Sequence, residues 1–188
     1  MQSRDRIAAA SEAAGVSAAR AGLLADAGLR GRWEVICRDR FGREKWREQI
    51  RNLVTNAGED YLLDVGLANG SKVATWYIGL IDSTPTVAET DTTSSHSGWT
   101  EVQDYDETTR QAFSPNAVSG QSVDNVGSLA AFTINANVTV GGMFLISESA
   151  KGGTGGTLYA AGAFSGGDKV LQTSDTLQVQ ATFTAGGA

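Results

Sequence analysis

The only histidine and the only cysteine in the chain limit the chemistry that it could perform. His96 lies in a loop rich in serine and threonine, where it could act as a general base for Ser94 or Ser97. Cys37 has no second cysteine for an intramolecular disulfide, and one histidine with one cysteine offers too few ligands for most zinc sites. We therefore expect His96 to be a solvated or hydrogen-bonded loop residue, and we predict no catalytic residue.

A run of acidic residues from Glu101 to Glu107 is the second candidate for chemistry. Paired carboxylates could serve a glycosidase, and clustered carboxylates could bind calcium. The run lacks the glycine and the ligand spacing of an EF-hand loop. Since adjacent acids in a turn are most often solvated, we predict no cofactor and no metal, and calcium is the alternative that the sequence leaves open.

The glycine-rich segment Gly152–Gly156 has some likeness to a phosphate-binding loop. It lacks the lysine and hydroxyl residue that end such a loop, and no helix is predicted after it. The segment is therefore interpreted as a flexible turn between two strands.

The candidate partner-binding residues lie between positions 32 and 51, where a period-two pattern predicts two strands. The turn Asp39–Arg43 joins them, with Gly42 in the left-handed conformation. The cationic and aromatic residues of this hairpin are Arg32, Trp33, Arg38, Arg40, Phe41, Arg43, Lys45, Trp46, Arg47 and Arg51. Rings among cations could stack on nucleic acid, but the interspersed acids lower the positive potential. We therefore expect the hairpin to dock on an acidic protein surface rather than on nucleic acid.

The distribution of charge supports two surfaces that meet different partners. Residues 1–53 contain 11 basic and 7 acidic residues, a net charge of +4. The rest of the chain contains 4 basic and 14 acidic residues, a net charge of −10. A basic leading part thus precedes an acidic body.

Three regions are predicted from the patterns along the chain. Residues 1–30 form an N-terminal arm, helical or extended, that is too poor in apolar residues to order itself alone. Residues 31–70 form the basic hairpin and one short helix, with Asn56 as its N-cap and an end near Ala68. Residues 71–188 are predicted to be β throughout.

Short strands separated by turns predict that the body is mainly β, an antiparallel β-sandwich or jelly roll. The clearest strand is Thr176–Thr184, in which Leu177, Val179, Ala181 and Phe183 should face inward. A second strand is predicted over Val138–Ser147; it is apolar on both faces, which suggests a subunit contact.

Several segments together resemble a family of small structural proteins of tailed-bacteriophage virions, over about residues 31–185. The segments are Arg51–Gly58, Tyr61–Asp64, Trp76–Leu80, Ser97–Val102, Thr109–Phe113, Gly156–Phe164, Gly167–Lys169 and Thr176–Val179. The resemblance implies a capsid decoration or cement role more than a tail role, and it brings no catalytic residue with it.

The expected function is therefore that of a non-enzymatic virion protein on the capsid surface, assembled in the host cytoplasm. It would bind across neighbouring major capsid subunits as a homotrimer and stabilise the head. A tail, neck or head-fibre component is the alternative, as is a carbohydrate-binding adsorption module, which exposed rings of Trp76, Trp99 or Tyr105 would support. No apolar run approaches the length needed to cross a bilayer, so no membrane partner is expected.

Overall fold

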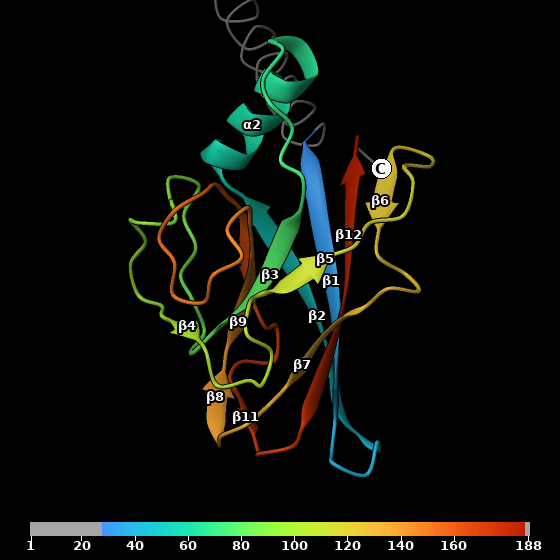
Figure 1. The fold of residues 1–188 in the computed structure, drawn as a ribbon, viewed down its shortest axis with the longest axis vertical. Helices are drawn as coiled ribbons and strands as arrows, with labels where there is room; N and C mark the ends of the chain where they lie inside the picture. The colour runs from blue at the N-terminus through green and yellow to red at the C-terminus, as the bar shows by residue number, and fades with distance from the viewer. Residues whose placement is uncertain (1–27, 187–188) are drawn as a thin grey trace, which may run out of the picture. The chain divides into compact units, whose positions relative to one another are not determined.

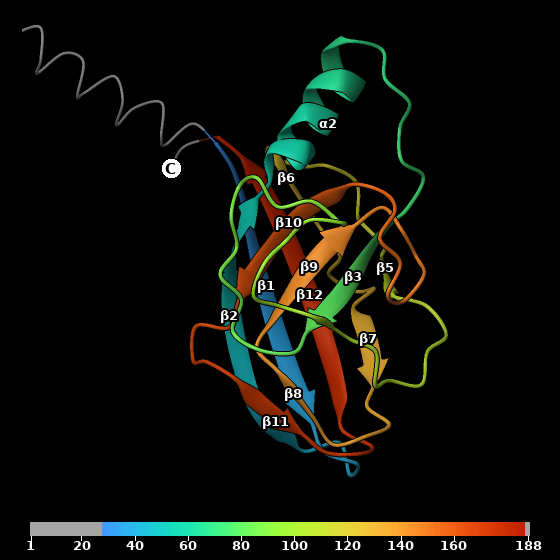
Figure 2. The same cartoon turned by 90° about the vertical axis from the view of Figure 1, so that its left-hand side faces the viewer.

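A computed structural model describes residues 28–186, which contain twelve strands and one helix (Figures 1 and 2). The helix is α2 (Asn56–Leu67). The strands are β1 (Leu29–Arg38), β2 (Glu44–Val54), β3 (Trp76–Ile81), β4 (Glu101–Val102), β5 (Gln111–Phe113), β6 (Ser122–Asp124), β7 (Ala130–Thr133), β8 (Val138–Val140), β9 (Gly142–Ile146), β10 (Leu158–Ala163), β11 (Lys169–Leu171) and β12 (Thr176–Ala185).

One large antiparallel sheet has the strand order β4-β3-β9-β10-β2-β1-β12-β6, with β5 also paired to β3 and β7 to β12. Strands β8 and β11 form a separate two-stranded sheet. Strand β2 pairs along most of its length with β1, but only its last residues, Leu53 and Val54, pair with β10. Strand β2 therefore joins two halves of the sheet. The halves meet at its Leu53–Val54 end and separate from each other toward Glu44.

The two halves pack face to face through aromatic rings. Phe183 of β12 lies with its ring centroid 5.5 Å from Tyr159 of β10 and 6.0 Å from Phe113 of β5. Two strands separate β12 from β10 in the sheet order, which at about 4.8 Å per strand would keep these rings apart in a flat sheet. The sheet is thus folded into two layers around a common core. The prediction of a mainly β, sandwich-like body is confirmed.

Alternation along β12 was read correctly from the sequence, because Leu177, Val179, Ala181 and Phe183 are all buried. The predicted strand Val138–Ser147, in contrast, is two strands, β8 and β9, which belong to different sheets. The break falls at Gly141, where a Cβ atom would collide with the backbone of Ser83 and Thr84.

Strand β9 also differs from its expected role. Its residues are buried within this chain, between β3 and β10. The apolar residues on both of its faces are therefore covered by the chain itself and need no subunit contact.

Helix α2 is present as predicted, but Thr55 and not Asn56 is its N-cap. The buried Thr55 hydroxyl accepts a hydrogen bond from the Gly58 N–H at 3.2 Å and donates one to the Leu158 carbonyl at 2.5 Å. Thr55 is the N-cap because its hydroxyl bonds to the helix and to β10 at the same time. The bond to β10 is a tertiary contact, which the local sequence does not indicate.

Arg30–Thr184 form one compact unit, so the hairpin and helix at 31–70 share one body with the strands that follow. The arm at 1–30 lies outside the described residues except for its last three. Within residues 28–186, no helix has the length and apolar character to cross a membrane.

Candidate partner-binding surface

The outer face of the β1–β2 hairpin is made by every second side chain of the two strands. Trp33, Val35 and Cys37 point into the core and are fully buried, so the residues between them face outward. The register sets Arg32 directly opposite Arg51, Glu34 opposite Gln49 and Ile36 opposite Arg47. We call these six residues the outer hairpin face.

Three of the predicted partner-binding cations are neutralised by acids of the chain itself. Arg43 pairs with Asp39 at 2.7 Å, and Lys45 pairs with Asp175 at 2.5 Å. Arg47 pairs with Glu34 and, at 3.1 Å, with Glu44. These cations hold the hairpin together and fasten it to the turn before β12.

The charged hydrogen bonds of the hairpin shift the pKa values of its acids. Partial burial raises the pKa of Asp39, but hydrogen bonds from the Arg43 side chain and from the backbone of Arg43 and Phe41 outweigh burial and lower it. The hydrogen bond from Arg47 lowers the pKa of Glu44. Both carboxylates are therefore ionised well below neutral pH.

Arg32 and Arg51 are the cations of the outer hairpin face that stay unneutralised. Both are exposed, and within residues 28–186 neither side chain makes a hydrogen bond or an ion pair. Like charges directly opposite each other across two strands are destabilising. A cavity of about 550 Å³ adjoins the pair, and Gln49, Phe164 and Ser165 contribute to its lining. The positive potential of the hairpin is thus concentrated where polar and apolar groups also reach the surface.

The turn of the hairpin exposes an aromatic ring between two cations. The Phe41 side chain is 67% exposed, and the Arg40 and Arg43 guanidinium carbons lie 4.7 and 5.1 Å from its ring centroid. Arg40 has no acidic partner in the described part of the chain. We call Arg40, Phe41 and Arg43 the hairpin tip.

Three of the predicted partner-binding residues serve the packing of the body. Trp33 is fully buried with its ring edge toward Phe183, so it cannot contact a partner in the folded chain. Trp46 is half-buried against Phe164. Arg38 donates from Nε to the Gln178 side chain of β12 at 3.3 Å. The predicted residues left for a partner are Arg32, Arg51, Arg40 and Phe41.

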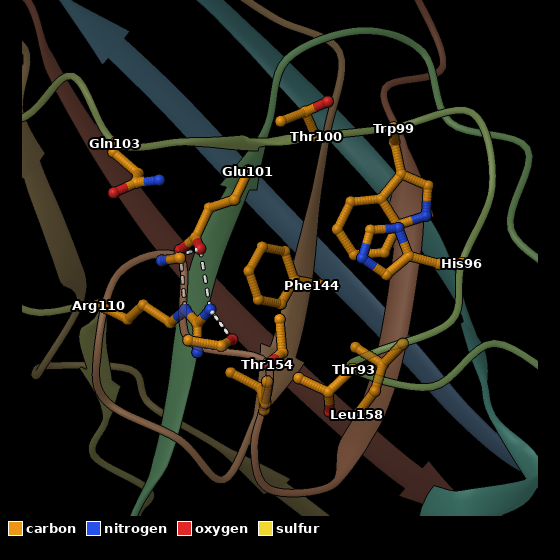
Figure 3. Close-up of a pocket in the computed structure, with 13 residues that line it drawn as sticks. Thr93, His96, Trp99, Thr100, Glu101, Gln103, Arg110, Phe144, Thr154 and Leu158 are labelled. Carbon is orange, nitrogen blue, oxygen red and sulfur yellow. Dashed lines mark hydrogen bonds and ion pairs between the residues drawn. The ribbon is translucent and has the colours of Figure 1, made fainter.

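A second hollow, of about 260 Å³, is lined by residues from the loops around β4 and the β9–β10 turn (Figure 3). One side of it is formed by an ion pair that the sequence analysis missed. The buried Arg110 guanidinium donates from Nε and Nη2 to the two Glu101 carboxylate oxygens, at 2.7 and 2.8 Å. Arg110 also donates to the carbonyls of Glu148 and Gly153, each at 2.9 Å. Every one of these contacts ties a loop to the body, so the first acid of the 101–107 run has a structural role.

Two further residues of the 101–107 run also make contacts within the body. Glu107 accepts a hydrogen bond from the Thr133 backbone, while Lys151 donates to the carbonyl of Tyr105 at 2.6 Å. Among residues 28–186, no group of three or more His, Cys, Asp or Glu side chains could hold a metal ion. The segment Gly152–Gly156 forms the turn that was expected, with positive φ at its first and last residues.

The residues considered for catalysis are poorly placed for it. His96 stacks on Trp99 with ring centroids 3.6 Å apart, and in the described chain no hydrogen bond joins it to Ser94 or Ser97. Burial of Cys37 raises the pKa of its thiol to about 12, which keeps it protonated. A protonated buried thiol is a poor nucleophile.

The three aromatic residues that could have supported carbohydrate binding do not present a free ring. Trp99 and Tyr105 are buried. Trp76 is half-buried between Tyr61 and Tyr159, with ring centroids 5.0 and 5.1 Å away. These rings pack within the chain and offer no exposed platform on which a sugar could stack.

A comparison of the sequence with models of known protein families and with curated proteins finds no match.

Proposed function

We propose that this chain is a non-enzymatic structural protein of a tailed-phage virion, which binds on the outside of the head and stabilises it as a decoration or cement protein. It would lie across neighbouring major capsid subunits. The resemblance of residues 31–185 to phage structural proteins supports this proposal. The non-enzymatic role is supported by the histidine and the thiol, because His96 stacks on Trp99 and Cys37 is buried.

The single observation that carries the proposal is the Arg32–Arg51 pair. Two exposed arginines face each other across β1 and β2 and have no acid to neutralise them in the described chain. Their repulsion is relieved when a carboxylate of another protein lies between them, because Arg binds carboxylates through two parallel hydrogen bonds. Each such contact is weak alone, but many copies on one shell would add through multivalency.

The test uses purified heads that lack the protein. We expect the wild-type chain to bind these heads and to raise the temperature at which they release DNA. The double variant Arg32→Glu and Arg51→Glu should bind about tenfold more weakly or not at all, because it places acids against an acidic surface. Binding of the wild-type chain should also weaken as salt is added.

Lys72→Glu is the matched control, since Lys72 is exposed and its side chain has no bonded partner in residues 28–186. It changes the net charge in the same direction without touching the hairpin and should bind nearly as the wild type does. Circular dichroism verifies that each variant is folded. The proposal fails if the wild-type chain neither binds heads nor protects them from heat; binding to isolated tails instead would indicate the tail or neck alternative.

A further inference from the structure

Helix α2 carries an apolar surface that the body does not cover. Gly58 is its buried residue, whereas Leu63 and Leu67 are 58% and 82% exposed, and Leu62 is also exposed. The helix stands out from one end of the β-rich body (Figure 2). A helix of twelve residues is marginal unless an apolar face is buried. Tyr61 packs on Trp76, with ring centroids 5.0 Å apart, but within residues 28–186 nothing buries the leucines of α2.

The charge of α2 determines what kind of partner surface can bind its leucines. Leu67 neighbours both Leu63 and Asp64 on the helix surface, because it follows them by four and three residues. The C-terminal end of a helix carries a partial negative charge, and α2 has no basic residue in its last turn. Glu59 and Asp60 add to the negative potential. A second α2 helix would bring like charges together, so the fitting partner surface is apolar and cationic.

The hairpin tip has this character. Phe41 is an exposed ring, Arg40 has no acidic partner in the described residues, and a recess of about 260 Å³ lies beside them. Gln172 and Thr173 also line this recess, together with Asp39 and Asp175, whose carboxylates are paired with Arg43 and Lys45. Arg40 is the cation that is left for a partner. Figure 1 shows α2 and the β1–β2 turn at opposite ends of the β-rich body. The two surfaces cannot meet within one chain, but they can meet between two.

We propose that the leucine face of α2 in one copy binds the hairpin tip of a second copy. Leu67 lies against Phe41 in the recess, and the Arg40 guanidinium approaches Asp64 and the helix C-terminus. Such a contact joins two different patches, so it is heterologous, and successive copies form a closed ring or an open chain. A ring of three copies would be the homotrimer that the sequence led us to expect. The contact goes beyond the docking of the outer hairpin face on a shell.

Sedimentation of the purified full chain over a range of concentrations tests the contact. We expect the wild type to associate, and Leu67→Ser and Phe41→Ala each to weaken association about tenfold or more, as truncation of an interface anchor does. Val126→Ser is the matched control because Val126 is 52% exposed between β6 and β7 and belongs to neither patch. It should associate as the wild type does.

Mixing the variants distinguishes this contact from a symmetric one. Leu67→Ser keeps an intact hairpin tip, and Phe41→Ala keeps an intact α2 face. Their mixture should form a one-to-one dimer and nothing larger, which also proves that both variants are folded. A helix-to-helix contact would instead let Phe41→Ala alone associate as the wild type does.

A charge exchange tests the polar part of the contact. Arg40→Glu alone should weaken association, and adding Asp64→Arg in the same chain should restore it. The proposal is overturned if the wild-type chain stays monomeric at every concentration, if the mixture stays monomeric, or if Val126→Ser weakens association as much as Leu67→Ser. Because no phage particle is present, these outcomes leave the shell-docking proposal to its own test.

Discussion

Arg110 shows how a single buried side chain can organise several loops. Its guanidinium joins Glu101 of β4 to the carbonyls of Glu148 and Gly153 in the β9–β10 turn. Both ionic partners are almost fully buried. Removal of one buried partner leaves the other charge uncompensated, which is far more costly than removal of both.

Arg110→Met should therefore lower the free energy of unfolding by about 3 kcal/mol or more. The double variant Arg110→Met with Glu101→Leu should recover part of that loss, because no unpaired charge is left buried. Denaturant unfolding measures all three chains, with Lys72→Met as the control for loss of an exposed cation. A loss below about 1 kcal/mol in the single variant would contradict the role assigned to the ion pair.

Glu48 makes a pH-dependent contribution to the stability of the fold. Its carboxylate accepts hydrogen bonds from the Ser165 hydroxyl at 2.9 Å and the Gly166 N–H at 3.3 Å, and it pairs with Lys169 at 2.7 Å. Burial raises the pKa of Glu48, but these partners outweigh burial and lower it below its usual value. A carboxyl whose pKa is lower in the folded than in the unfolded chain stabilises the fold above its unfolded pKa, and that contribution disappears as the pH falls through the folded pKa.

Glu48→Gln should accordingly lower the free energy of unfolding by about 1 kcal/mol near pH 7. The difference from the wild type should shrink as the pH is lowered from about 6 to about 3. Urea unfolding at a series of pH values measures it, and Glu89→Gln, at an exposed position, should show little difference at any pH. A constant difference across the series would mean that the charge of Glu48 is unimportant.

Sequence alone could find the cations of the hairpin but not which of them are free. Alternation turns Arg32 and Arg51 outward, whereas the neutralisation of Lys45 depends on Asp175, 130 residues away. The burial of Trp33 follows from the same alternation, and grouping it with the surface cations by residue type was an error. Arg110 was missed because its partners lie in segments up to 43 positions away.

At the scale of elements, α2 carries two glycines with opposite surroundings. A Cβ atom at Gly58 would collide with the carbonyl oxygen of Tyr159, whereas a Cβ at Gly66 would meet nothing within 4 Å. The close approach at Gly58 is what lets the first turn of the helix rest on β10.

Gly58→Ala should therefore destabilise the chain by about 1–3 kcal/mol through overpacking against β10. Gly66→Ala should stabilise it by about 0.5–1 kcal/mol, because alanine is the better helix former where space is open. Thermal unfolding of the two variants beside the wild type compares the same substitution in one helix. Equal effects at the two positions would show that α2 does not rest on β10 as described.

Elements were predictable where local pattern decides them and not where distant backbone decides them. The period-two pattern of β12 and of the hairpin, and the helix after Thr55, agree with the structure. The division of Val138–Ser147 at Gly141 comes from the approach of Ser83 and Thr84, about sixty residues earlier, which no local pattern contains.

At the scale of the whole molecule, the folded β body separates its charges. The unneutralised Arg32 and Arg51 face outward from β1 and β2, whereas residues 54–188 are strongly acidic. Such a separation favours docking through the outer hairpin face. A partner with an acidic surface is attracted to the arginines of the hairpin and repelled by the acidic rest of the body. The layered fold could be inferred from the number of short strands, but the sharing of β2 between the two layers could not.

We infer that the outer hairpin face is the side on which this protein docks to a phage shell. A cryo-EM reconstruction of heads decorated with the purified chain tests it most directly. We expect density for the β-rich body on the outside of the head, with Arg32 and Arg51 against acidic residues of the shell protein. Density in which this arginine pair faces solvent while another surface of the chain contacts the shell would contradict the account.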